Sequence, residues 1–557
     1  MRDWRPDLSG FLPSRPGFDL IMHSLEKNRN EETSVDQSGD NIHSPHDIAA
    51  AELINASGHI QEVDRNFGLV SLTGYGLVSG NVWPALGGTI LVAIFNGGPP
   101  GTIYEFVAAG IFYFMITACI AELASAIPST AGVYHWASVT PGKRYGRVIG
   151  YYAGYWNYLG WMLASASVCA IVGNVCVQMY GVTHPEYTSK PWHVFLGYII
   201  MLWTSCLFVC YANKLIPHLG TIGIFFIIVG GFITVVVCAA VPGYGGRPGH
   251  ASEAFVWKDW VADLGYPDGF VFLAGMLNGA YAIGTPDLVC HLAEEIPRPH
   301  VNVPKAMGLQ MGIGFLSGFA YLIAILYTIN DFDALSSSTF PIAEIYAQAT
   351  GSTAGTIGLL FLILVVFVLE SVGANITVGR GLWTLARDGA TPFSGFLSRV
   401  SPARGMPLNA TIASAVLNTL LACVYLGSTT AFSALASAFV LLTTASYTAA
   451  ILPHLLTGRK NIRFGPFHMK GWLGFAVNGI ACTYMIVFFV IFCFPYSLPT
   501  NAKTMNYSSV IFGGSTILIT AWYFLGGKKG YTGPQTIGGK VYEADLIKKV
   551  AMVVPKA

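Results

Sequence analysis

The feature of this sequence that most restricts its fold is a series of long apolar segments, which begins near residue 68 and continues almost to the C-terminus. A helix needs roughly 20 apolar residues to cross about 30 Å of hydrocarbon, because it rises about 1.5 Å per residue. We predict twelve such spans, at residues 68–95, 103–127, 148–179, 192–212, 217–241, 269–292, 307–329, 355–384, 407–426, 431–456, 472–494 and 507–526. They lack the alternating pattern of barrel strands, so we expect an all-α membrane protein with twelve transmembrane helices.

Composition and motifs argue against several other classes of protein. Charged residues make up 11% of the chain, against roughly 25% in soluble domains. The 30 Lys and Arg residues nearly balance the 29 Asp and Glu residues, so no overall basic field attracts nucleic acid. The sequence contains no zinc-protease helix, phosphate-binding loop or Cys/His cluster. We therefore expect no enzymatic step, no metal site and no cofactor.

The distribution of basic residues predicts the orientation of the spans. With the N-terminus inside, most Lys and Arg residues, among them Arg144 and Arg298, fall in the inner connections, as is typical of cytosolic loops. Both termini are then cytosolic. The polar composition of residues 1–66 predicts a disordered cytosolic tail, followed by a twelve-helix domain at residues 67–527 and a cytosolic C-terminal tail at residues 528–557.

Two of the predicted spans are interrupted in the middle by polar and helix-breaking residues. The sixth contains "NGAYAIGTPD" (residues 278–287), and the first contains "SLTGYGLVSGNVWPALGG" (residues 71–88). Broken helices are tolerated in a membrane only where they face protein or a water-filled cavity, so the freed main-chain groups can bind a solute. A simple proline kink would explain one break alone. Two breaks five spans apart instead fit an inverted repeat, whose paired broken helices meet at mid-membrane.

Four stretches of this chain form a recognisable set: "SGNVWPALGG", "AELASAIPSTAGVYHWA", "HLAEEIPRPHVNVPKAM" and "GLWTLARDGATP". In this order they resemble the amino acid-polyamine-organocation superfamily, especially its fungal choline and amino-acid permease branch, and the resemblance extends from about Phe67 to Leu525. It implies a leucine-transporter-like core of two inverted five-helix repeats, residues 67–242 and 269–457, with two further helices at residues 472–527. It also implies that the broken first and sixth helices, with the third and eighth, surround the solute.

The first break departs from the pattern of many amino-acid permeases. It reads Ser79-Gly80-Asn81-Val82-Trp83, where those relatives carry a Gly-Ser-Gly type of turn, and it is similar to the "NSW" pattern of fungal choline carriers. An amine without an α-carboxylate thus becomes more plausible, although the Gly80 and Asn81 amides could still hold a carboxylate. The substrate-binding residues expected from the two breaks are Gly80, Asn81, Trp83, Asn278, Gly279, Tyr281 and Gly284.

Aromatic and acidic side chains elsewhere complete the predicted site. Tyr155 and Tyr158 share a face of the aromatic third span, where they could form a cage for an organic cation or simply pack. Glu370 lies near the middle of the eighth span, where a carboxylate is costly, so we expect a counter-charge to the solute, a proton carrier or a hydrogen-bond partner to another helix. For Asp287 we favour a helix cap over an ammonium ligand.

Charged residues at the inner ends of the spans predict a gate. Glu122, Glu294 and Glu295 are expected to pair with Arg144, Arg147 or Arg298 and to hold one conformation closed. The coupling ion stays open between a proton and sodium; the fifth span lacks the lysine that carries protons in some bacterial relatives.

These observations predict a secondary transporter rather than an enzyme. The expected solute is a small nitrogenous molecule, choline or a related amine first and an amino acid or γ-aminobutyrate second. A channel or a solute-sensing receptor is the alternative of another class. The expected surroundings are the lipid bilayer of the plasma membrane, and no nucleic acid partner is expected.

Overall fold

The computed structural model describes residues 68–534, apart from residues 185, 245–248, 263, 339, 402, 428–429 and 503. Over these residues the chain is helical, and its β pairing is limited to an isolated bridge between Ser401 and Met406. The predicted all-α class is confirmed for this part of the chain. The predicted tail at residues 1–66, and the C-terminal tail beyond residue 534, lie outside the described residues.

Nine helical segments of the described chain are long and apolar enough to cross a membrane. They are α6 (Gly98–Ala126), α8 (Gly146–Thr183), α9 (Pro191–Tyr211), the segment Asn213–Gly243, α14 (Pro299–Leu326), α17 (Thr353–Arg387), residues Ala434–Leu456 of α20 (Thr430–Leu456), α21 (Gly471–Ile491) and the segment Ser508–Gly530. A shorter apolar helix covers Leu408–Val424 within α19 (Leu408–Gly427). These segments coincide with predicted spans, although α14 begins at Pro299, where the sequence pattern is still polar.

Both predicted breaks occur in the structure. The first span is divided into α3 (Leu69–Ser79), α4 (Val82–Gly88) and α5 (Ile90–Ile94), with Gly80 and Asn81 between the first two helices. The sixth consists of α13 (Asp268–Ile283) and, after a turn, the 3₁₀ segment η4 (Leu288–Glu295). Neither helix is a continuous rod, because Gly and Pro residues at the breaks disrupt the regular hydrogen-bond ladder.

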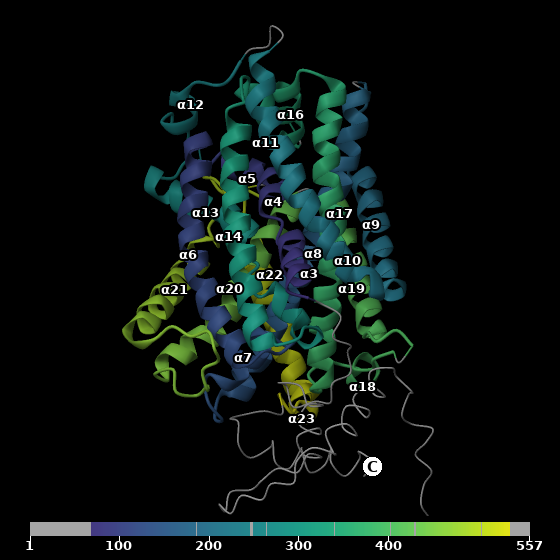
Figure 1. Cartoon of the computed structure of the whole chain (residues 1–557), viewed down its shortest axis with the longest axis vertical. Coiled ribbons are helices and arrows are strands. Elements are labelled where there is room, and N and C mark those ends of the chain that lie inside the picture. The colour runs from purple at the N-terminus through teal and green to yellow at the C-terminus, as the bar shows by residue number, and fades with distance from the viewer. Residues whose placement is uncertain are drawn as a thin grey trace, which may run out of the picture. The chain divides into compact units, whose positions relative to one another are not determined.

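Short helices mark the two ends of the bundle (Figure 1). The helices α12 (Glu253–Trp257) and α16 (Pro341–Thr350) lie at one end, which we call the α12 end. The helices α7 (Val133–Val139) and α18 (Ser394–Leu397) lie at the opposite end, called the α7 end. Helices α6 and α13 both begin at the α12 end, and α3 begins toward the α7 end.

The interior is closely packed around the interrupted helices. Helix α8 lies against α9, α17 and α20, and α3 lies against α10 (Ile216–Phe225) and α17. The contact between α3 and α10 is direct between main chains, because a Cβ atom on Gly74 would come within 2.2 Å of the Gly220 carbonyl oxygen. Small residues that let helix backbones approach are typical of helix contacts in membranes.

Candidate substrate site

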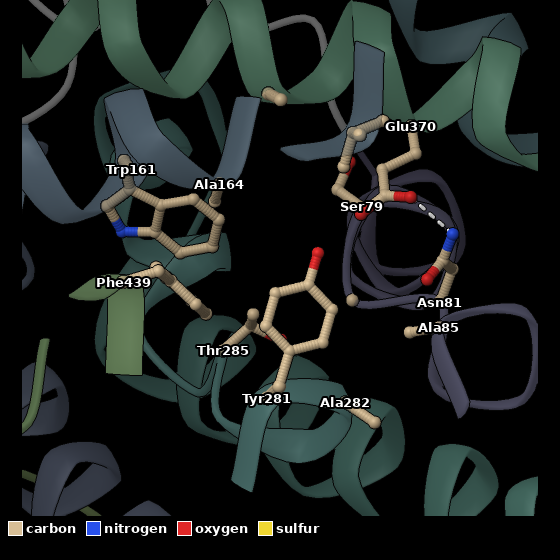
Figure 2. Close-up of a pocket in the computed structure, with 13 residues that line it drawn as sticks. Ser79, Asn81, Ala85, Trp161, Ala164, Tyr281, Ala282, Thr285, Glu370 and Phe439 are labelled. Atoms are coloured by element: carbon tan, nitrogen blue, oxygen red, sulfur yellow. Dashed lines mark hydrogen bonds between the residues drawn. The ribbon is translucent and has the colours of Figure 1, made fainter. Parts of the chain in front are cut away.

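A pocket lies where the two breaks meet α8, α17 and α20 (Figure 2). It encloses about 370 Å³ of atom-free space, counted to its open mouth. The lining residues come from five parts of the chain and are Ser79, Gly80, Asn81, Ala85, Trp161, Ala164, Val168, Tyr281, Ala282, Thr285, Glu370, Ala374 and Phe439.

One wall of the pocket is polar and carries a carboxylate. Asn81, at the first break, donates a hydrogen bond from Nδ2 to Oε2 of Glu370 on α17. No Lys, Arg or His side chain forms an ion pair with Glu370 in the described part of the chain. Ser79 stands beside these two residues, and its buried hydroxyl has no hydrogen-bond partner within the described residues. This wall therefore offers one acidic group and one free hydroxyl to a solute.

The opposite wall is aromatic. Trp161 of α8 and Phe439 of α20 have ring centroids 5.7 Å apart, and the Phe439 and Tyr281 rings meet edge to face at 5.9 Å. Figure 2 shows the Tyr281 ring between this pair and the Glu370 side of the pocket. The Tyr281 hydroxyl is 2.8 Å from Ser167 Oγ on α8, which fixes the ring. Aromatic faces opposite a carboxylate form a site that favours an organic cation.

Asp287, just after the second break, holds one of these aromatic residues in place. Its Oδ2 atom accepts hydrogen bonds from Asn157 Nδ2 at 2.7 Å and from Trp161 Nε1 at 3.2 Å, while Oδ1 accepts from the Tyr447 hydroxyl at 2.5 Å. The side chain is fully buried, and His291 Nε2 lies 3.5 Å from Oδ2. The capping role that we expected is wrong, because the Asp287 side chain makes no cap bond to η4. It instead joins the broken helix to α8 and α20.

The structure brings four of the ten predicted binding residues into the pocket, namely Gly80, Asn81, Tyr281 and Glu370. Three predicted aromatic residues lie elsewhere. Trp83 is fully buried and donates from Nε1 to the Ile227 carbonyl at 3.1 Å. Tyr155 donates its hydroxyl hydrogen to the Ala390 carbonyl at 2.9 Å, and the Tyr158 hydroxyl is 3.3 Å from Ser414 Oγ. None of the three lines the pocket, since each is turned toward a neighbouring helix or loop.

The other three predicted residues shape the second broken helix without lining the pocket. Thr89 donates its hydroxyl hydrogen to Asn278 Oδ1 at 2.6 Å. This hydrogen bond joins α13 to the helices that follow the first break. Gly279 faces α6, where an added Cβ would meet Ala109 Cβ at 2.9 Å. Gly284 ends α13, and its carbonyl accepts from the Tyr447 hydroxyl at 3.4 Å.

The acidic residues predicted to form a gate are paired, but with different arginines from those expected. At the α7 end, Glu122 of α6 binds Arg459 Nη2 at 2.6 Å and the Met469 amide at 2.6 Å. Glu295 binds Arg380 of α17 through Nε at 2.7 Å, and Glu294 lies 3.8 Å from Arg387 Nη2. These arginines come from α17 and from the loop after α20, and helix packing brings them to η4 and α6.

The predicted basic partners near α8 do not take part in these pairs. The Arg144 guanidinium lies 5.1 Å above the ring of its neighbour Tyr145, and the Arg144 side chain is exposed. Arg147 donates from Nη2 to the main-chain carbonyls of Lys528 and Tyr531. The expected position of these arginines at the same membrane face as the glutamates therefore did not predict which arginine pairs with which glutamate.

Sequence reasoning did not select Trp161, Phe439, Ser79 or Thr285, all of which line the pocket. Trp161 belongs to the same aromatic stretch as Tyr155 and Tyr158, so an aromatic residue at this point was visible in the sequence. It lies with Ala164 and Val168 on the face of α8 that lines the pocket, about 120° from Tyr155. Phe439 is one aromatic residue within a long apolar run, and nothing local distinguishes it. No group of His, Cys, Asp and Glu with the arrangement of a metal site occurs in the part of the chain that the structure describes.

Comparison with known proteins agrees with this architecture. The family profile described as "Amino acid permease" matches residues 67–517. The chain belongs to this amino acid permease family. A choline transporter of Saccharomyces cerevisiae is 31% identical over 490 residues, which cover 87% of this chain and 85% of that protein.

Other relatives are named for other substrates. A swainsonine transporter of Arthroderma benhamiae is 28% identical, over 78% of this chain and 85% of its own length. An amino-acid permease of Arabidopsis thaliana is 24% identical, over 86% of this chain and 94% of its own length. The family and the long apolar helices make the chain a multi-pass membrane transport protein of the amino acid-polyamine-organocation superfamily.

Proposed function

We propose that this chain is a secondary transporter that moves a small organic cation, choline or a related amine, across the membrane by alternating access. The observation that carries the proposal is the pocket between the two breaks, where Glu370 faces Trp161, Tyr281 and Phe439. A quaternary ammonium gains about 0.5–2 kcal/mol from each well-placed ring, and a carboxylate without a basic partner supplies the counter-charge. The choline transporter among the relatives supports the same substrate class.

The proposed topology has twelve spans. The nine long apolar segments, α19 and the two interrupted helices add up to this number. Two inverted repeats of five spans, residues 67–242 and 269–457, would place both breaks at mid-membrane, with the last two helices outside the core. We assign the α7 end to the cytosol because the basic loops gather there, and we place the protein in the plasma membrane with both termini inside.

An amino acid, including γ-aminobutyrate, is the second candidate solute. The free hydroxyl of Ser79 beside the Gly80–Asn81 break offers a hydrogen bond that a carboxylate can accept. The same hydroxyl can also bind the alcohol group of choline. The two candidates therefore differ in whether Glu370 or the break provides most of the recognition.

A competition experiment separates these candidates and tests transport itself. The full chain is reconstituted in vesicles preloaded with unlabelled choline, and entry of labelled choline is measured against choline, γ-aminobutyrate, basic and neutral amino acids. We expect saturable entry that internal choline accelerates and that external choline inhibits best. A channel passes label without this acceleration, and a receptor passes none. Stronger inhibition by γ-aminobutyrate or a neutral amino acid would replace the substrate proposed.

The role of Glu370 is tested by Glu370→Gln. Glutamine keeps an oxygen that can accept from Asn81 Nδ2 but removes the negative charge, so we expect the rate of choline entry at low concentration to fall about tenfold, which corresponds to about 1.4 kcal/mol. The matched control is Glu253→Gln, which removes an exposed carboxylate on α12. Equal entry rates for wild type and Glu370→Gln, at equal amounts of protein, would remove this carboxylate from recognition.

A further inference from the structure

A second carboxylic acid is buried in the membrane-spanning part of the molecule, away from the pocket. Glu105 lies about two turns into α6 from the α12 end, and 1% of the residue is exposed. Neither Oε1 nor Oε2 has a hydrogen-bond partner among the described residues. Glu370, by contrast, is bonded to Asn81.

The space for this carboxyl group is created by a glycine on the broken helix α13. A Cβ atom added to Gly275 would lie 2.2 Å from Cδ, Oε1 and Oε2 of Glu105, so the carboxyl rests directly on the α13 backbone. On α6 itself, a Cβ atom added to Gly101 would lie 3.3 Å from Oε1 of Glu105. The carboxyl is thus enclosed between α6 and the half of the broken helix that faces the α12 end.

No charged group in the described surroundings compensates Glu105. Helix α6 packs against α5, α12, α13, α14, α20 and α21. The titratable side chains on α6 and these helices, besides Glu105, are Tyr104, Tyr113, Cys119 and Glu122 on α6; Asp268 and Tyr281 on α13; His300, Lys305 and Tyr321 on α14; Glu253 on α12; Tyr447 and His454 on α20; and Cys482 and Tyr484 on α21. Asp268 accepts from Trp260 Nε1, and Glu122 is bound to Arg459. None of them forms an ion pair or hydrogen bond with Glu105 in the described structure.

The protonation state of Glu105 follows from this environment. Burying an ionised carboxylate without a partner costs more free energy in such a site than binding a proton from water at neutral pH. In the conformation seen here, the group is therefore the neutral acid. When the gap between α6 and α13 opens to water, the acid loses its proton to water, and closing the gap requires the proton to return.

From this geometry we propose that Glu105 is a proton-binding site of the transport cycle, which must be occupied before the α13 half of the broken helix can close against α6. Movement of this half is possible because α13 ends at Ile283 and is joined to η4 by a turn rather than by a continuous helix. Thr89 and Asn278 connect α13 to the corresponding half of the first broken helix, so the two halves move together. The proposal rests on the transport function proposed above.

The test is the pH dependence of choline exchange in vesicles that have the same pH inside and outside. Choline keeps its charge at every pH, so the solute itself does not titrate. If closing requires one proton on Glu105, the fraction of molecules able to close falls as the pH rises. We therefore expect the wild-type exchange rate to fall, by up to tenfold per pH unit, between pH 5.5 and 7.5. Glu105→Gln is permanently neutral and should exchange with less than a twofold change over this range. The control Glu253→Gln should retain the wild-type dependence.

Three outcomes of this experiment are distinguishable. Exchange that is independent of pH in the wild type, or equally dependent in Glu105→Gln, overturns the proton site while leaving the transporter intact. Absence of saturable exchange in every variant, wild type included, overturns the transport function instead. A flat profile in Glu105→Gln alone supports the proton site.

A chemical measurement on the wild-type chain keeps the proposal testable if Glu105→Gln does not fold. A membrane-soluble carbodiimide adds a protonated carboxylic acid across its C=N bond: the carboxyl oxygen bonds to carbon and the proton passes to nitrogen. Mass spectrometry should find the adduct on Glu105 at pH 7, but not on Glu253, which is exposed to water. Absence of the adduct on Glu105 at pH 7, when the same reagent modifies Glu105 in denatured protein at pH 4.5, would show that Glu105 is not held as the acid.

Discussion

At the scale of single residues, Asp287 holds Trp161, an aromatic residue of the pocket wall, and ties the second broken helix to α8 and α20. It accepts from Asn157, Trp161 and Tyr447, and only a carboxylate offers enough acceptor positions for all three donors. In Asp287→Asn the amide group must face at least one donor, so we expect a loss of about 2–3 kcal/mol and a lower midpoint of thermal unfolding in detergent. Tyr447→Phe removes one donor and should cost about 1 kcal/mol. A midpoint for Asp287→Asn no lower than that of Tyr447→Phe would contradict this account.

The same scale shows how far the sequence could predict the site. Asn81 and Glu370 were predictable because a polar group within an apolar span is costly and has to face something useful. Tyr155 lies on a different face of α8 from the pocket residues Trp161, Ala164 and Val168, about 120° from Trp161 at about 100° per residue. Periodicity groups residues by face, but it does not say which face of a buried helix meets the pocket. The donors around Asp287 come from α8 and α20, far away in the sequence, so no local pattern predicts that the carboxylate binds them rather than a helix end.

At the scale of elements, the contact between α3 and α10 depends on glycine. An alanine Cβ at position 74 would lie 2.2 Å from the Gly220 carbonyl oxygen, and neither main chain can move without displacing its helix. We expect Gly74→Ala to cost about 1–3 kcal/mol and to reduce folded yield, measured by size-exclusion chromatography. Gly308→Ala on α14 is the matched control, since an added Cβ there meets no atom within 4 Å and alanine favours helix. Similar yields for the two variants would show that the α3–α10 contact is not tight.

The spans themselves were the most predictable elements, because a membrane imposes their length and composition on the sequence directly. The two breaks were also visible, since Gly, Pro and Asn interrupt otherwise apolar runs. The start of α14 was missed by eight residues, because His300, Asn302 and Lys305 interrupt the apolar pattern where the helix extends beyond the apolar run. The ends of helices outside the membrane are decided by tertiary contacts, which the pattern of one span does not contain.

At the scale of the whole molecule, the pocket and the α7 end are parts of one mechanism. The broken helix α13–η4 carries Tyr281 into the pocket and, at its other end, Glu295 into a buried ion pair with Arg380 of α17. Helix α17 likewise carries both Glu370 and Arg380. Separation of η4 from α17 would therefore open the pocket toward the α7 end and break this ion pair in one movement.

Glu295→Gln tests this link. The substitution leaves the Arg380 guanidinium buried without its counter-charge, which destabilises the closed α7 end and favours a conformation in which water reaches Arg380. We expect a cysteine placed at Ala374, in the pocket, to react at least tenfold faster with an impermeant thiol reagent added from the α7 side. The control Arg144→Gln changes an exposed cation outside these pairs and should alter the rate less than twofold. The cysteine at position 374 could react no faster in Glu295→Gln than in this control. The ion pair with Arg380 would then not hold the α7 end closed, and another contact would govern the access of solute to the pocket.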